Sequence, residues 1–591
     1  MPSLLTRLFL RTTELIDRRI GWDKLPPILG ISVLVGIRDA LREHNLYDTY
    51  QGRPPEAPAV EPTGYLTVRT ADGSYNDLSV PSMGMANTRF GRNVPPAEGH
   101  AETLPELMDP NPRLISTKLL QRRDFQPATS LNVLAAAWLQ FETRDWFSHG
   151  TDPNRMLEIP RPDGDTEWPE ATIKVPATAV DPTAAPGGST FVNTETHWWD
   201  ASQIYGSNQD FQKAIRSGKG GKVRIDADGF IDIDPALIGA SGGADGWWLG
   251  MELMGTIFMR EHNAICDRLK AAYPSWDDDQ LFNKARLINA ALIAKIHTIE
   301  WTPAILGHPT LQIGMRANWF GLAGERVKES FGRLSSSDVL SGIPGSTTDH
   351  HTAPYSITED FVTVYRMHPL VPDDYEFLSL TTGVEPRQLT FGEIHGGANS
   401  RGVLKSMGVA ECLYSLGVAH PGAVTLHNSP NFMRNFQRTD EHTLDMIATD
   451  ILRSRERGVP RYNDFRRALR LNPVTSFDQI SGGDAATAAV MAEIYGGDIE
   501  KVDTTVGMFG EKLPEGFGFS DTAFRIFVLM ATRRLKSDRF YTVDFTPRVY
   551  TPEGIDWIDH NDMTSVLLRH YPELEPPLRG QRNAFAPWAR I

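Results

Sequence analysis

Two long helical segments follow one another in the middle of the chain and leave little room for a fold built on a large sheet. Residues 247–273 and 277–306 carry apolar side chains at helical spacing, and three aspartates open the second segment, where the helix dipole favours negative charge. Further helices are predicted at residues 130–149, 360–368, 440–458 and 520–540. Signals for alternating strands are few and short. The pattern predicts a mainly α-helical protein.

The domain organisation follows from where the composition changes. Residues 51–64 are rich in proline, and no later break in composition divides the 591-residue chain. We therefore predict an N-terminal helical arm and linker at residues 1–64 and one large domain at residues 65–591. Residues 151–188 are rich in Pro, Asp and Gly, which predicts a long loop.

Charge and cysteine content exclude several classes of protein. A net charge of -15 argues against a nucleic-acid binder, because a basic surface is needed to offset phosphate charge. Only Cys266 and Cys412 are present, so neither a disulfide framework nor a cysteine-rich metal site is expected. This suits a reducing compartment, and we predict a cytoplasmic protein with no obligate protein partner.

The N-terminal region does not read as a signal peptide or a membrane span. Arg7 and Arg11 interrupt the first apolar run, and no small-residue cleavage site follows it. The apolar run at residues 28–37 is too short to cross a bilayer. It is either a buried helix or the apolar face of an interfacial helix, so peripheral membrane contact through the N-terminal helices remains open.

The stretch TVYRMHPL, residues 363–370, places Tyr365 and His368 three residues apart in a predicted helix. Side chains at this spacing share a helix face. Neutral imidazole is an axial ligand for haem iron, and a tyrosine one turn away could give an electron to an oxidised haem. The alternative is an ordinary packed core.

A second segment, NTETHWWDASQIYGS, offers oxygen atoms at every second residue. Thr196, the backbone of Trp198, Asp200 and Ser202 supply them. Calcium favours hard oxygen ligands of this kind, and one more carboxylate would complete the shell. The alternative is a polar turn in which Asp200 caps a helix.

Arg144 and Asp145 lie inside the aromatic-rich helical segment WLQFETRDWFSHG. Charges there are costly unless each finds a partner. Asp145 could supply the missing calcium ligand, whereas a buried ion pair is the simpler interpretation. Gln140 lies four residues before Arg144, which puts both on one helix face.

Two further groups could bind a carboxylate. His297 and Thr302 would line one wall of a pocket if the helix ends or bends near Trp301. Arg533 and Arg534 follow an apolar run, and a buried arginine is a natural clamp for a carboxylate because it forms bidentate hydrogen bonds. Paired arginines are, however, mostly surface residues.

The ordered motifs REHN, HWWDASQIYGS, YRMHPLVPDD and RSRERGVPRYNDFRR resemble the animal-type haem peroxidase superfamily, which includes the cyclooxygenases. The nearest resemblance is to the fatty-acid α-dioxygenases, and it extends from GWDKLPPILG to RRLKSDRF. It implies a large, single-domain, mainly α-helical fold with few short strands. It also implies haem b bound between the helix of residues 130–149 and the helix that holds Tyr365 and His368.

The resemblance also implies a role for each candidate residue. His368 would bind the haem iron, Tyr365 would carry a radical, and Asn428 in LHNSPNF would orient His368. The calcium ligands would be Asp145, Thr196, the backbone of Trp198, Asp200 and Ser202. The fatty-acid carboxylate would be held by His297, Thr302 and Arg534, with Arg533 close by.

These roles imply a reaction between a fatty acid and O2. The Tyr365 radical would remove hydrogen from the α-carbon, and oxygen would add there to give a 2-hydroperoxy fatty acid, which can lose carbon dioxide to leave a shortened aldehyde. The alternatives are another haem dioxygenase or peroxidase of the superfamily with different regiochemistry, or a haem- or lipid-binding protein with weak catalysis.

One position departs from the family pattern. Family members have a distal histidine, which exchanges a proton with peroxide, where this chain has Arg144. Arginine remains protonated in proteins and cannot act as that base. His149 lies five residues on, at roughly 140° around a helix, and is not expected to replace it. We therefore expect weak peroxidase turnover.

Overall fold

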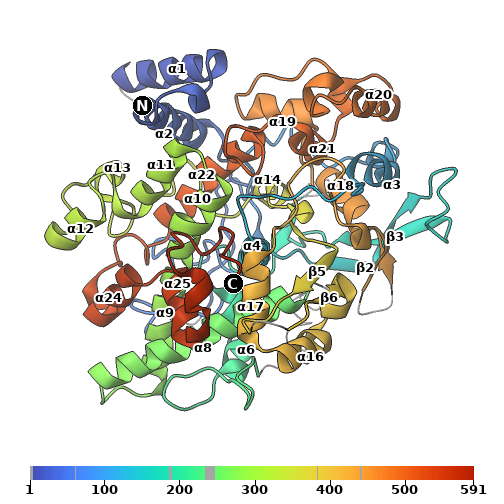
Figure 1. Cartoon of the computed structure of the whole chain (residues 1–591). Coiled ribbons are helices and arrows are strands. Elements are labelled where there is room, and N and C mark those ends of the chain that lie inside the picture. Colours follow the sequence, from blue (N-terminus) through green and yellow to red (C-terminus); the bar gives the residue numbers. More distant parts are fainter. Residues whose placement is uncertain (1–3, 60, 185–189, 233–245, 382–383, 439–441) are drawn as a thin grey trace.

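Buried helices form the centre of the protein (Figure 1). The computed structural model describes residues 4–59, 61–184, 190–232, 246–381, 384–438 and 442–591. Helix α8 (Leu249–Ala272) packs against both α4 (Val133–Trp146) and α9 (Asp278–Ile296). Helix α22 (Asp521–Ser537) packs against α2 (Pro27–His44) and α14 (Glu359–Val364). The predicted mainly helical fold is confirmed.

The segment predicted as one helix over residues 277–306 is helical throughout but changes its winding. Asp277 caps α9 and forms a capping box with Gln280, as the acidic opening indicated. After Ile296 the chain continues as a π-helix (His297–Trp301) and then as α10 (Thr302–Ile305). The Thr302 N–H donates to the carbonyl of His297, five residues earlier. This wider turn brings residues five apart onto one side of the helix.

The predicted helix over residues 360–368 is wrong at its C-terminal end. Helix α14 ends at Val364, Tyr365 lies just beyond it, and His368 begins a separate 3-10 turn (His368–Leu370). Pro369 has no N–H to donate to the carbonyl of Tyr365, so an α-helix cannot continue through His368. Tyr365 and His368 are therefore brought together by a bend and not by one helix face.

The described strands are short and form two-stranded antiparallel pairs. The pairs are β1 (Thr88–Arg89) with β4 (Val192–Asn193), β2 (Thr151–Pro160) with β3 (Thr172–Thr178), β5 (Asp374–Phe377) with β6 (Arg387–Thr390), and β7 (Phe436–Gln437) with β8 (Thr443–Leu444). The loop predicted at residues 151–188 is therefore wrong for its first part, which forms the β2–β3 hairpin. Ile173, Val175 and Ala177 alternate into the interior, a period that the proline-rich composition obscured. Residues 185–189 lie outside the described part of the chain.

The N-terminal arm packs on the helical body. Helix α1 (Leu4–Arg19) lies on α2, and α2 contacts α11 (Pro309–Phe320). Trp22, between α1 and α2, is buried and donates to Asp521 of α22 at 3.0 Å. The apolar run at residues 28–37 lies in α2 and is partly buried, since Val33 and Ile37 are buried while Ile28 is 78% exposed; membrane contact through it stays a prediction. The division at residue 64 stays a prediction.

The other predicted helices are present with shorter bounds. Residues 440–458 hold α18 (Met446–Glu456), although residues 440–441 lie outside the described part. The other α-helices in the described part of the chain are α3 (Pro112–Ile115), α5 (Ser202–Tyr205), α6 (Gln209–Ile215), α12 (Glu325–Phe331), α13 (Asp338–Ser341), α15 (Phe391–Ile394), α16 (Gly397–Met407), α17 (Val409–Val418), α19 (Tyr462–Ala468), α20 (Ala485–Ile494), α21 (Thr504–Gly510), α23 (Pro547–Tyr550), α24 (Pro552–His560), α25 (Met563–His570) and α26 (Glu575–Leu578). Within the residues described, no helix has both the length and the apolar character that a bilayer crossing needs.

Candidate active site

A cavity of about 680 Å³ is lined by five of the predicted site residues, among them Ser202. Gln140 and Arg144 reach it from α4, and Tyr365 and His368 reach it from the bend after α14. Its volume falls within the range of about 300–1,000 Å³ that is usual for ligand sites. The predicted pairing of these two segments across one pocket is therefore present.

His368 is oriented by a carboxylate. Its Nδ1 lies 2.7 Å from Oδ2 of Asp450 on α18, and Oδ1 of Asp450 pairs with Arg366. Burial raises the pKa of Asp450, but Arg366 and His368 more than offset this and hold the pKa below its ordinary value. Asp450 is thus an anion beside Nδ1, and Nε2 is the ring nitrogen left for a metal. A carboxylate behind the imidazole is the usual arrangement for a metal-binding histidine.

Asn428 does not orient His368, which corrects the expectation for this residue. Its Oδ1 accepts hydrogen bonds from Arg122 Nε and from the backbone N–H of Gln126, both at 3.1 Å. Its Nδ2 donates to the carbonyls of Gln126 and Ala423. The whole amide is therefore used to hold neighbouring loops together, and Asp450 takes the place beside the histidine.

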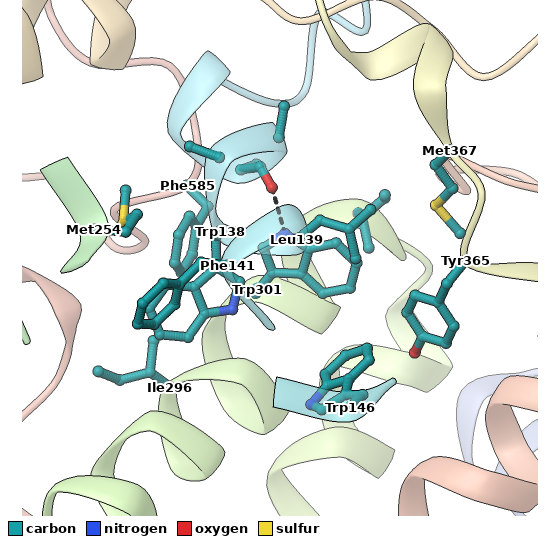
Figure 2. Packing of buried hydrophobic residues seen from close by; sticks show 14 of the residues in the cluster. Trp138, Leu139, Phe141, Trp146, Met254, Ile296, Trp301, Tyr365, Met367 and Phe585 are labelled. Carbon is teal, nitrogen blue, oxygen red and sulfur yellow. Dashed lines mark hydrogen bonds between the residues drawn. The ribbon is translucent and has the colours of Figure 1, made fainter. Parts of the chain in front are cut away.

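Tyr365 is a buried phenol against aromatic neighbours. It is 5% exposed and lies beside Trp146 (Figure 2). Its ring centroid is 5.0 Å from that of Trp146 and 4.5 Å from that of Phe361. Burial raises the pKa of Tyr365 above its ordinary value, although the charge of Arg534 opposes the rise. The phenol is therefore protonated at neutral pH, so any oxidation of it must also release a proton.

Arg534 lies in an aromatic sandwich with unused hydrogen-bond donors. Its guanidinium carbon is 4.2 Å from the Trp146 ring centroid and 4.4 Å from that of Trp199. The residue is 1% exposed, and its Nε and Nη2 have no hydrogen-bond partner among the described residues. The nearest carboxylate, on Asp145, is 4.0 Å away. Buried donors on a cation are costly to leave unpaired, so the site is suited to an incoming anion.

His297 lies at the same aromatic cluster, and Thr302 is hydrogen-bonded to His297 through the backbone of the π-helix. The His297 ring stacks on Trp301 at 4.6 Å and contacts Trp146 and Trp199, each at 5.2 Å. Burial, together with the charge of Arg534, holds the pKa of His297 well below its ordinary value, so the imidazole is neutral. The buried hydroxyl of Thr302 has no partner in the described part of the chain.

Trp146 is the residue that connects these groups, and sequence reasoning missed it. Its indole contacts Tyr365, His297 and Arg534, so the tyrosine and two of the predicted carboxylate-binding groups surround one side chain. Trp199 forms the opposite face of the sandwich around Arg534. Both tryptophans belong to motifs described in the sequence analysis. The sequence around a tryptophan does not show whether its ring contacts functional groups or only packs in the core.

Arg533 is not part of this cluster, which corrects the expectation that it lies close to the substrate carboxylate. Its guanidinium donates to the backbone carbonyls of His350, Ala353 and Pro354. Adjacent residues on a helix point about 100° apart, so when Arg534 faces the tryptophans, Arg533 must face another neighbour. Its role is to hold the segment before α14 in place.

Gln140 and Arg144 line the same cavity as His368 and come from α4. The Gln140 amide donates to the carbonyl of Gly246 at 2.8 Å and accepts from Trp248 Nε1 at 2.7 Å. The Arg144 guanidinium lies 5.2 Å from the Trp247 ring centroid. Burial lowers the pKa of Arg144, and the carboxylate of Glu195 partly offsets this.

His149 does not supply the missing base. Its Nε2 lies 3.0 Å from Glu359, and its ring stacks on Phe90 at 4.2 Å. It is not among the residues that line the cavity. The expectation that His149 cannot stand in for a distal histidine agrees with this placement.

Four of the five predicted calcium ligands form two hydrogen-bonded pairs. Asp145 Oδ1 accepts from the Ser202 hydroxyl at 2.9 Å, and Thr196 donates to Asp200 at 2.9 Å. Burial and the charge of Asp200 raise the pKa of Asp145 well above its ordinary value, and its Oδ2 has no hydrogen-bond partner among the residues described. Two buried carboxylates in mutual repulsion are the charge pattern that a bound cation would relieve.

Two other features bear on this site. Asp200 also pairs with Arg286 at 3.1 Å, which compensates part of its charge. Trp198 anchors its indole on the carbonyl of Gly73 at 2.9 Å, which fixes the backbone between Thr196 and Asp200. In the described residues no group of three or more His, Cys, Asp or Glu side chains is placed to hold a metal. The predicted calcium ligands include only two carboxylates, so the other ligands would be neutral hydroxyl and carbonyl oxygens.

Comparison with known proteins defines the class. The family model described as animal haem peroxidase matches residues 68–585. The chain therefore belongs to the animal haem peroxidase family, as its helices and paired cavity walls indicate.

The branch within that family is equally clear. The chain is 36% identical to Alpha-dioxygenase 1 of Capsicum annuum over 604 residues, covering 99% of this chain and 92% of that protein. It is 37% identical to Alpha-dioxygenase 2 of Arabidopsis thaliana, with 97% and 92% covered. A crystal structure of the Oryza sativa fatty acid alpha-dioxygenase, in a tyrosine-to-phenylalanine variant with palmitic acid, superimposes with a TM-score of 0.91 at 34% identity, covering 100% of this chain and 98% of that one. Within the family, the chain belongs to the group that contains the alpha-dioxygenases.

The residues around the cavity fit the haem that the family implies. His368 lines a cavity of sufficient volume, and the carboxylate of Asp450 lies 2.7 Å from its Nδ1, which leaves Nε2 to bind iron. Apolar and sulfur-containing side chains, including Met251, Met259 and Met433, contribute to the same walls. A flat, apolar macrocycle with an iron centre matches this combination of lining and ligand.

Proposed function

We propose that this protein is a haem-dependent fatty-acid α-dioxygenase that adds O2 at the α-carbon and forms a 2-hydroperoxy fatty acid. Such a product can lose carbon dioxide and leave an aldehyde one carbon shorter. The observation that carries the proposal is the pair of unused buried donors on Arg534, next to the indole that also contacts Tyr365. The alpha-dioxygenase relatives support the same reaction.

The head group of the fatty acid binds first in this scheme. Arg534 offers Nε and Nη2, which lie in the fork geometry that matches a carboxylate, and Thr302 offers its free hydroxyl. Trp138 Nε1 donates to Nδ1 of His297 at 3.2 Å, so the proton of the neutral imidazole lies on Nε2. His297 can therefore donate one more hydrogen bond. Holding the carboxylate fixes the next carbon, which is the one to be oxidised.

Tyr365 then acts on that carbon. Bound haem supplies the one-electron oxidant for the phenol. The resulting Tyr365 radical takes one hydrogen atom from the α-carbon and becomes a phenol again, and O2 adds to the carbon radical. The peroxyl radical takes the hydrogen back from Tyr365, which restores the tyrosyl radical and completes the product. Close packing of Trp146 and Phe361 on the Tyr365 ring keeps water away from it.

His368 would hold the haem iron through Nε2, with Asp450 behind it. The carboxylate increases the electron-donating strength of the imidazole and fixes its orientation. Gln140 has both ends of its amide engaged, so it forms a wall of the cavity and does not transfer protons.

We also propose calcium at Asp145, Thr196, Trp198, Asp200 and Ser202. The Oδ2 atom of Asp145, which has no hydrogen-bond partner among the described residues, and the raised pKa of this carboxyl support a cation there. Calcium would link α4 to the segment that leads into α5, and so would hold Arg144 and Trp146 in place from the adjoining residue. The cytoplasm is the proposed location, supported by two free cysteines, both buried.

A second candidate function rests on Arg144. A permanent cation cannot accept the proton of a peroxide, which favours a protein with weak peroxide activation or with different regiochemistry. Against simple haem or lipid binding stands the presence of both Tyr365 and the carboxylate-binding donors, since binding alone needs no redox-active phenol.

The test uses purified haem-loaded protein with palmitate, with oxygen uptake followed and the products identified. Uptake that yields the 2-hydroperoxide or the shortened aldehyde supports the proposal. Oxidation at a mid-chain carbon selects the different regiochemistry, and a haem spectrum without uptake selects the binding protein. Tyr365→Phe should abolish uptake and leave the haem spectrum intact; full activity in that variant would disprove the radical role.

A further inference from the structure

Helix α1 turns its apolar side chains outward. Leu4, Leu8 and Leu15 are 84%, 62% and 51% exposed, and their spacing of four and seven residues puts them on one face of the helix. Leu5 and Phe9 are also exposed beside them. A helix at the surface of a globular protein normally buries its apolar face, so this orientation is reversed.

The inward side of α1 is held by Thr13, Asp17 and the partly buried Ile16, which packs against the core. Thr13 is the one residue of α1 that is buried, and it lies so close to Gly36 of α2 that a Cβ at Gly36 would be 2.1 Å from its hydroxyl oxygen. Asp17 pairs with Arg525 at 2.8 Å. The exposed leucines are therefore not needed to attach α1 to the body.

Positive charge flanks the outward leucines. Helix α1 contains four arginines and two acidic residues; Asp17 pairs with Arg525, and Glu14 lies between Arg18 of the same helix and Arg470. Arg7, Arg11 and Arg19 are exposed, and the helical repeat places Arg7 and Arg11 on one edge of the leucine face and Arg19 on the other. In a chain with a net charge of -15, this face has the opposite sign.

The turn into α2 and the first turn of α2 also expose apolar side chains. Ile20, Ile28 and Leu29 are 49%, 78% and 55% exposed. Figure 1 shows α1 at the edge of the molecule, with α2 between it and the helical body. No other described helix covers the outward face of α1 in this arrangement.

We infer that the outward face of α1, together with the α1–α2 turn, docks on the surface of a lipid bilayer that contains anionic lipids. Exposed leucines would enter the boundary between headgroups and acyl chains, while the arginines at both edges would reach the phosphates. A second copy of the chain fits this face less well, because a two-fold pair would bring the arginines of both copies together. The inference does not rest on the proposed reaction.

The experiment is flotation of the full-length haem-loaded protein with vesicles of phosphatidylcholine alone or mixed with phosphatidylglycerol. We expect binding to the anionic vesicles that added salt weakens. Replacing Leu4, Leu8 and Leu15 together by serine should lower the vesicle partition coefficient at least about tenfold. Replacing Arg7, Arg11 and Arg19 by glutamine should lower it roughly fivefold for each arginine, on anionic vesicles only.

A matched control replaces three equally exposed leucines elsewhere, Leu66, Leu78 and Leu104, by serine. This control should bind like the unmodified protein. The inference is overturned if the unmodified protein binds neither vesicle, or if the α1 triple variant binds as well as the control. It is also overturned if sedimentation in the absence of lipid gives a dimer that the α1 triple variant disrupts while vesicle binding is absent, since that outcome identifies a second copy as the partner.

Discussion

Arg534→Gln is the sharpest test of the carboxylate site. The guanidinium is 1% exposed and lies between two indoles, and two of its donors have no partner among the described residues. A substrate carboxylate bound there would form a buried, charge-assisted pair. Losing one partner of such a pair costs about 2–5 kcal/mol, which corresponds to roughly 30-fold to several-thousand-fold in kcat/KM.

The assay compares oxygen uptake with palmitate and with its methyl ester, which lacks the negative charge. The unmodified enzyme should prefer the acid by a factor within the range above, and Arg534→Gln should lose most of that preference. The substitution should change the ratio of kcat/KM for the acid to kcat/KM for the methyl ester. Both substrates place the same α-carbon next to Tyr365, and only the acid carries the negative charge.

Arg533→Gln is the matched control, one residue earlier on the same helix. Its guanidinium binds backbone carbonyls at residues 350–354, so the variant should lower Tm and leave the preference for the acid unchanged. If Arg534→Gln folds, binds haem and still prefers the acid by the original factor, the carboxylate does not bind at Arg534 and the reasoning fails.

Three further predictions concern other parts of the site and its support. Asp450→Asn removes the charge behind His368 and should weaken haem binding about 10- to 100-fold and raise the haem reduction potential, as measured by haem titration and potentiometry; unchanged values would rule out the carboxylate contact. Arg144→His should increase peroxide turnover with a small aromatic reductant, and no increase would show that the distal base is not what limits it. Burial raises the pKa of Glu300 to about 8, from an ordinary 4.5, so the folded state favours the protonated acid. Protonated Glu300 contributes its full stabilisation below about pH 4.5, and this contribution to the free energy of unfolding, on the order of 4 kcal/mol, is lost as the pH rises from there to about 8. Chemical denaturation at pH 5 and at pH 8 should show the fall in stability. Glu300→Gln should make the stability nearly independent of pH over this range.

Local patterns were sufficient for most of the helical framework. The apolar periodicity at residues 247–273 and 277–306 corresponds to α8 and to the run from α9 to α10, since buried helices carry a strong repeat. The β2–β3 hairpin was missed because its strands lie among prolines and acidic residues, and its pairing is between segments. The end of α14 was misplaced, although Pro369 marks it in the sequence.

The sequence by itself determined which residues are available for chemistry. It also showed that their motifs occur in the order found in haem peroxidases, with Tyr365 and His368 in one motif and Arg144 in the position of a distal base. Only the tertiary structure decided which neighbour each side chain meets. It directs Arg534 to the tryptophans and Arg533 away, and it puts Asp450 instead of Asn428 beside His368. The physical reason is that motif spacing specifies direction only within one element, whereas a contact between elements depends on how their packed faces are turned.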